Sequence, residues 1–176
     1  MSETSGQSGM KQRLVDAYYH MLGRLKTSVE NAEHGTGPAL TRAVERAQET
    51  ATELGELSRE EAERVGDYLT RDLQDAGRFL ATNGSELAGW LKFDLKLVEQ
   101  GLADLFRDTV DYARLEYGEL EARANAVGEW HSGEVTGIGT LQCKACGELL
   151  HFHHISHIPP CPKCHGSVYR RVSRED

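Results

Sequence analysis

The sequence has no apolar run of the ~18 to 20 residues that a membrane-spanning helix requires. Its first six residues also lack the basic segment and apolar stretch of a secretory signal. Aromatic residues make up only 7% of the 176-residue chain, which is too little for one large compact core but leaves enough apolar material for amphipathic helices. We therefore expect a cytoplasmic protein of one or two domains that does not associate with membranes.

Positive charge is also scarce, since the net charge is -8, and this disfavours broad binding to nucleic acid or anionic membranes. The deficit is uneven. Up to Trp130 there are 15 Lys and Arg against 24 Asp and Glu, whereas from His131 onward there are 5 against 4. All four cysteines and six of the eight histidines lie in that second part. The chain therefore reads as two chemically different modules.

Proline is almost absent from residues 8–126, where Pro38 is the only one. Apolar residues recur there every three or four positions, the spacing of one helical face. A first helix is expected to end near Gly35, a residue type that commonly caps helix C-termini. A second helix is expected to begin at Pro38, whose missing N–H is harmless in a first turn.

A third helix is marked by Ser58 and Glu61, which form a capping-box pattern, and it is expected to stop at Asn83-Gly84. Ser85 would then cap a fourth helix that runs to about Ala126. Its first half carries a second apolar row and would be buried on two sides. Its second half would touch one partner or mediate self-association.

The helical region shows no pattern of a catalytic site. A di-metal site in a helical bundle needs Glu-x-x-His pairs, but the residues three positions before His20 and His34 are Ala17 and Asn31. The many carboxylates fit a solvated helix surface. We therefore expect that the protein is not an enzyme.

Two C-x-x-C pairs supply the clearest motif, namely Cys143, Cys146, Cys161 and Cys164. A two-residue gap lets one tight turn direct two thiolates at one ion, and the 14 residues between the pairs suffice for a hairpin that returns the second turn. The spacing predicts one structural Zn²⁺ per chain. Four thiolates leave no open position for catalysis.

Other readings of the cysteines are weaker. A disulfide framework does not suit a cytoplasmic protein, and a thioredoxin-like pair would need a single C-x-x-C beside a βαβ pattern. An iron-thiolate redox site, as in rubredoxin-like proteins, is chemically feasible, but the cysteine pairs of those proteins lie farther apart. The histidines nearby are expected to be exposed residues of loops and strands, and a second metal site is an open but weaker alternative; they are His151, His153, His154, His157 and His165.

The segment from about Gly128, through His131-Ser132-Gly133-Glu134 and Gly137-Ile138-Gly139 to the second cysteine pair, resembles the YbeL-like family. That bacterial family contains zinc ribbons and has no established function. The resemblance implies metal binding in a bacterial cytoplasm and implies no reaction. Where relatives place glycine directly after the second pair, this chain has His165, so this turn is expected to be strained or shifted by one residue.

The sequence thus predicts a mainly α fold, with an N-terminal antiparallel helical bundle or long helical hairpin and a small C-terminal β zinc ribbon. The expected boundaries are a disordered segment 1–7, an acidic α-helical domain 8–126, a linker 127–133, a zinc ribbon 134–172 and a tail 173–176.

The favoured function is that of a non-enzymatic zinc-binding protein whose partner is another protein. A nucleic-acid-associated or transcription-associated factor is the alternative. It would use a small patch of basic and aromatic ribbon residues, which are Lys144, Lys163, Arg170, Arg171, Arg174, Phe152 and Tyr169.

Overall fold

The computed structural model describes residues 3–31, 39–83 and 87–172. The fold is mainly α, with a small antiparallel β region at the C-terminus, as the sequence predicted. The helices are α1 Glu3–Glu30, α2 Ala39–Glu53, α3 Arg59–Asn83, α4 Leu87–Leu91, the 3₁₀ helix η1 Leu95–Leu97, and α5 Gln100–Val127. The strands are β1 Trp130–His131, β2 Val135–Thr136, β3 Gly139–Cys143, β4 Leu149–Phe152, β5 Ser156–His157 and β6 Val168–Arg171.

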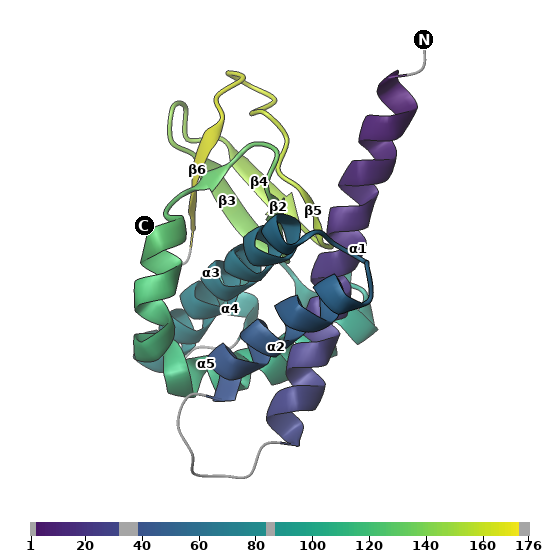
Figure 1. Ribbon diagram of the computed structural model, residues 1–176. Coiled ribbons are helices and arrows are strands. Elements are labelled where there is room, and N and C mark those ends of the chain that lie inside the picture. The colour runs from purple at the N-terminus through teal and green to yellow at the C-terminus, as the bar shows by residue number, and fades with distance from the viewer. Residues whose placement is uncertain (1–2, 32–38, 84–86, 173–176) are drawn as a thin grey trace.

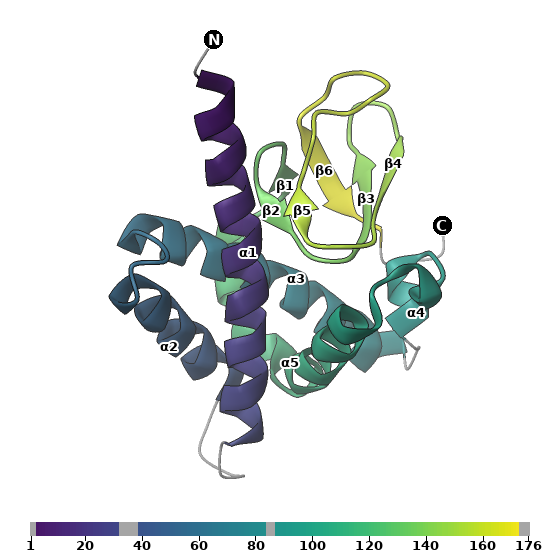
Figure 2. The ribbon, with the colours of Figure 1, turned by 90° about the vertical axis from the view of Figure 1, so that its right-hand side faces the viewer.

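The helices form one body, and the ribbon packs on one side of it (Figures 1 and 2). The N-terminal half of α1 extends past this body on the side of the ribbon. Helix α1 begins at Glu3, within the segment that was expected to be disordered. No described helix combines the length and apolarity needed to cross a bilayer.

The start of α3 confirms the capping box. The Ser58 backbone N–H donates to Glu61 Oε2 at 2.8 Å, and the Glu61 N–H donates to Ser58 Oγ at 3.2 Å. These hydrogen bonds satisfy two backbone donors that have no partner within the helix. Asn83 is the last described residue of α3, and Gly84, where the helix was predicted to stop, lies outside the described residues. Gly35, Pro38 and Ser85, which were expected to terminate or begin helices, lie outside the described residues.

The prediction of one continuous fourth helix is wrong, because the chain leaves the helical conformation between α4 and α5. Lys92 has a positive φ of 61°, and the Asp94 side chain accepts a hydrogen bond from the Lys96 N–H at 2.9 Å, a local bond that competes with helix formation. A straight helix would hold Trp90 and Phe106 ~24 Å apart along its axis. In the structure their rings stack at 5.5 Å, and both are fully buried. Core packing therefore favours the break.

The expected second apolar row is only partly buried. Trp90 is buried and Phe93 packs at the edge of the core, but Leu97 is 59% exposed. The second half of the expected helix corresponds to α5, which packs along α3 and buries Val110, Ala113 and Leu120. Self-association through this half stays a prediction, and Leu115, at 78% exposure, is the apolar side chain that it would use.

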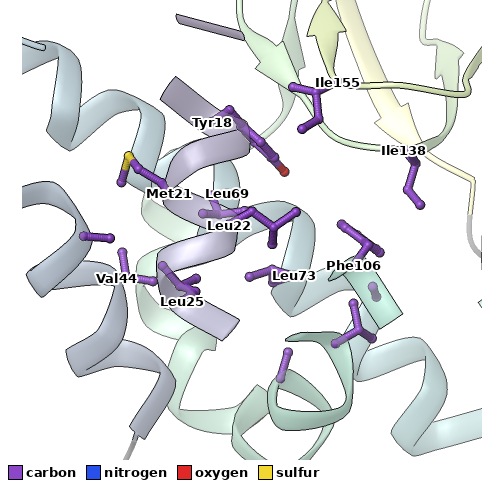
Figure 3. Close-up of a cluster of buried hydrophobic side chains, with 14 of the residues drawn as sticks. Tyr18, Met21, Leu22, Leu25, Val44, Leu69, Leu73, Phe106, Ile138 and Ile155 are labelled. Atoms are coloured by element: carbon purple, nitrogen blue, oxygen red, sulfur yellow. The ribbon is translucent and has the colours of Figure 1, made fainter. Parts of the chain in front are cut away.

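The ribbon consists of a four-stranded sheet in the order β1-β6-β3-β4 and a two-stranded sheet of β2 and β5. Strand β1 lies in the segment expected to be a linker, and it pairs with β6 through Trp130 and Tyr169. The two modules are not separate in space, because Val135, Ile138 and Ile155 of the ribbon join the core of the helices. Figure 3 shows Ile138 and Ile155 beside Tyr18 and Phe106.

Two glycines in the paired helices should respond oppositely to alanine. A Cβ at Gly77 of α3 would lie 2.6 Å from the Ala113 carbonyl carbon of α5, which is backbone and cannot turn aside. Gly77→Ala is therefore expected to lower the free energy of unfolding by about 3 kcal/mol. A Cβ at Gly118, in the interior of α5, meets nothing within 4 Å, so Gly118→Ala is expected to raise that free energy by about 1 kcal/mol. Urea denaturation followed by circular dichroism measures both, and equal effects would contradict the close approach of α3 and α5.

Candidate metal centre

The two cysteine pairs occupy two turns at the same end of the ribbon. The turn from β3 to β4 and the loop before β6 both lie at the end of the ribbon away from α3 and α4 (Figure 2). The four Sγ atoms all lie within 4.8 Å of one another. The Sγ atoms of Cys143 and Cys164 are 3.5 Å apart, and those of Cys146 and Cys161 are 3.6 Å apart. Tetrahedral bonds of ~2.3 Å to one Zn²⁺ place neighbouring sulfurs ~3.8 Å apart, so the cluster fits such an ion.

Local backbone geometry closes both turns. The Gly147 N–H donates to the Cys143 carbonyl at 2.9 Å, and the His165 N–H donates to the Cys161 carbonyl at 2.8 Å. Gly147 has a φ of 80° and His165 a φ of 59°, so the histidine has the left-handed conformation that is strained for a residue with a Cβ. A Cβ at Gly166 would lie 3.2 Å from the sulfurs of Cys143 and Cys164. The closeness of the two sulfurs therefore favours glycine at position 166. The backbone strain of the left-handed conformation falls on His165 instead.

The thiols are coupled electrostatically. Burial raises the pKa of Cys161, but backbone hydrogen bonds from Cys164 and Lys163 outweigh it and lower this pKa to about 7. The Gly166 N–H lowers the pKa of Cys164, whereas the three neighbouring thiols raise it, to about 12. Four thiolates this close repel one another, so all four ionise together only with a cation among them.

Three of the nearby histidines, His151, His153 and His157, make structural contacts. His151 Nδ1 is 2.8 Å from Thr140 Oγ1, and the rings of His151 and His153 both meet Phe93 edge-on. His157 links the ribbon to α1, because its two ring nitrogens are each 2.8 Å from a backbone carbonyl, of Gly133 and of Lys11. Within the described residues, the four cysteines form the one group of three or more side chains placed to hold a metal.

Sequence reasoning missed the residue that joins the ribbon to the helices. Asp72 of α3 is fully buried, and its carboxylate accepts hydrogen bonds from five groups. The donors are Tyr18 Oη at 2.8 Å, Trp130 Nε1 at 2.8 Å, Thr136 Oγ1 at 3.1 Å, the Gly137 N–H at 2.8 Å and the Arg171 guanidinium at 3.0 Å. Four of these donors belong to the ribbon. One signal in the sequence could have indicated that Asp72 is buried. It lies three residues after Leu69 and four before Ala76, on the apolar face of α3.

Two buried arginines flank this carboxylate. Arg171 lies 5.0 Å from the ring centroids of both Trp90 and Trp130, and Arg71 lies 4.6 Å from that of Trp130. Each guanidinium has nitrogens that find no acceptor in the described part of the chain, and the aromatic faces partly compensate for this. Burial raises the pKa of Asp72, but Arg171 and Arg71 outweigh it and hold the pKa below its usual value.

The structure corrects the expected basic and aromatic patch. Phe152, Tyr169 and Arg171 are buried inside the protein, and the Tyr169 hydroxyl donates to the Pro159 carbonyl at 2.7 Å. The period-two pattern of β6 turns Tyr169 and Arg171 inward together. The exposed basic side chains of the ribbon already have partners, which are Glu129 for Lys144, Glu148 for Lys163 and Gln142 for Arg170. Arg174 lies outside the described residues.

Together, the fold and the cysteine cluster define a helical protein with a C-terminal ribbon that carries a candidate four-cysteine metal site. The chain belongs to the family described as zinc-ribbon-containing domain, whose sequence model matches residues 27–173. The match includes most of the helical region, although the motif resemblance was sharp only in the last quarter.

Relatives from three Escherichia coli strains support this assignment. The proteins named "Uncharacterized protein YbeL" of strains K12, O6:H1 and O157:H7 are each 27% identical to this chain over 163 residues. Each alignment covers 90% of this chain and 96% of the relative. No solved structure matches the chain.

Proposed function

We propose that this protein is a non-enzymatic, cytoplasmic zinc-binding protein that acts through contact with another protein. The observation that carries this proposal is the closed set of four thiolates. Soft thiolates in a tetrahedral arrangement suit Zn²⁺, and a complete protein ligand set leaves no position for a substrate or an activated water. The zinc therefore supplies folding free energy to the ribbon rather than chemistry.

One zinc ion per chain is the expected result of elemental analysis of the purified protein. Since the chain has only four cysteines, titration with a mercurial thiol reagent should release the metal with four equivalents, as followed by a zinc-sensitive dye. Iron-thiolate absorbance in the visible range, or retention of the metal in Cys161→Ser, Cys164→Ser protein, would contradict the assignment.

The proposed contact surface is the metal end of the ribbon. Leu149 is an apolar side chain with 45% exposure, and the side chains of Lys144 and Lys163 are 46% and 63% exposed. Lys144 and Lys163 lie between the cysteines of the two pairs, and Leu149 is the first residue of β4. The ribbon that carries them is packed against the helices. An apolar centre with a charged rim is the usual composition of a protein interface.

Affinity capture from the native cells tests this surface. Leu149→Glu, Lys163→Glu protein keeps all four ligands and should lose the partner, whereas Leu115→Glu protein, altered on the exposed side of α5, should retain it. A partner that is retained by the ribbon variant but lost with Leu115→Glu would place the contact on the helices instead.

Weak nucleic-acid binding is expected, because phosphate recognition needs clustered positive charge. Arg171 is buried against Asp72, and a Zn²⁺ with four thiolates carries a formal charge of about -2. At ~0.15 M salt the dissociation constant for mixed DNA and RNA oligonucleotides should be ~10 μM or weaker by fluorescence anisotropy. Sub-micromolar binding that weakens in Arg170→Ala protein would support the nucleic-acid alternative.

A further inference from the structure

A surface groove of about 550 Å³ lies between α1 and α2. The residues that line it belong to α1, α2 and the segment after α2, so the groove is distinct from the cysteine cluster. The volume lies in the range of small-molecule sites, ~300 to 1,000 Å³. The lining residues that bear on its chemistry are His20, Gly23, Arg24, Ser28, Arg46 and Glu56.

The charge in this groove is positive, in contrast to the acidic helical region around it. Glu56 is the one carboxylate in the lining, and Arg24 donates to both of its oxygens at 2.8 and 2.6 Å. These hydrogen bonds lower the pKa of Glu56, so it remains ionised and neutralises Arg24. Arg46 is exposed to solvent, and its guanidinium makes no hydrogen bond or ion pair with any described residue. Among the described residues, no carboxylate pairs with this positive charge, which is open to an anion from the solvent.

Gly23 keeps the groove open. A Cβ at this position would meet nothing within 4 Å, so neither close packing nor a turn accounts for a glycine in the middle of α1. Glycine there destabilises the helix by about 1 kcal/mol relative to alanine. The space above Gly23 belongs to the groove.

We propose that this groove binds a small phosphate-type oxyanion, either free phosphate or the phosphate group of a small monoester. Arg46 supplies the charge, and the His20 ring and the Ser28 hydroxyl supply further donors. Charge-assisted hydrogen bonds of this kind are about twice as strong as neutral ones. The groove is larger than phosphate alone, and Tyr19, at 42% exposure in its lining, offers an aromatic surface to an organic group.

Titration of the zinc-loaded, full-length protein by ¹H–¹⁵N NMR tests the proposal, with inorganic phosphate and phenyl phosphate as separate probes at constant ionic strength. Saturable shifts are expected for the amides of Gly23 and Ser28. Arg46→Gln should weaken binding at least tenfold. Arg64→Gln removes the same charge from an exposed arginine on α3, whose partner is Glu60, and should leave the affinity unchanged within twofold.

Gly23→Leu supplies a second variant that fills the groove without changing its charge, and it should abolish binding while circular dichroism remains that of the folded protein. Tighter binding of phenyl phosphate identifies a monoester as the ligand, and equal affinities identify free phosphate. Shifts that rise linearly with concentration, or an affinity that Arg46→Gln and Arg64→Gln reduce equally, would show that the groove does not bind the oxyanion specifically.

Discussion

Asp72→Ala is expected to lower the free energy of unfolding by about 3 to 5 kcal/mol. The substitution leaves Arg171 buried without its carboxylate, whereas Arg71 keeps its ion pair with Glu134 at 2.8 Å. Removing one partner of a buried ion pair has an effect of this size. It also leaves the buried Trp130 N–H and Tyr18 hydroxyl without an acceptor. Urea denaturation of the zinc-loaded protein gives the magnitude.

Asp67→Ala is the matched control, because Asp67 lies on the same helix and pairs with Arg123 at 2.9 Å with both side chains partly exposed. Such a surface pair contributes ~0 to 1 kcal/mol. Asp72→Asn keeps the shape of the side chain and should be less destabilising than alanine. Equal effects of Asp72→Ala and Asp67→Ala would show that the carboxylate does not hold the ribbon to the helices.

The same carboxylate gives the stability a pH dependence of known sign. Because the folded-state pKa of Asp72 lies below its ordinary value, its contribution is complete above ~3.9, the pKa in the unfolded chain. The contribution is lost as the pH falls from that value through the folded-state pKa. The difference in stability between wild-type and Asp72→Asn protein should therefore shrink in acid.

Removal of the metal is expected to unfold the ribbon and also to destabilise the helices. The core within the ribbon is small, so the free energy of metal binding, about 10 to 16 kcal/mol for comparable zinc sites, supplies most of its folding. Strand β6 connects the metal end to Arg171, and that residue contacts Asp72. Loss of the metal should therefore release Arg171 from Asp72.

The two tryptophans make this loss measurable. Trp90 and Trp130 are the only tryptophans, both are buried, and each donates to a carboxylate of α3, of Asp75 and Asp72 respectively. Chelation should shift their fluorescence to longer wavelength and lower the melting midpoint of the helical circular dichroism. In the chelated protein Asp72→Asn should have little further effect, because its ribbon partners are gone. An unchanged helical midpoint would mean that the helices and ribbon fold independently.

The sequence by itself determined the four cysteines of the candidate metal site and the start of α3. The two residues between the cysteines of each pair specify a local turn. Such a short pattern can be interpreted without knowing which distant residues it contacts. The same holds for Ser58 and Glu61, whose hydrogen bonds span three positions. The mainly α fold followed from a periodicity that is likewise local.

Only the tertiary structure decided where the last long helix breaks and how the ribbon meets the helices. The apolar stripe continues from Leu91 through Leu95 and Val98 to Leu102, but burying both Trp90 and Phe106 in one core requires the chain to turn between them. Asp72 and Arg171 are 99 positions apart. A buried carboxylate is stable only with such a partner, and no local pattern encodes a contact that exists only after the ribbon has packed on α3.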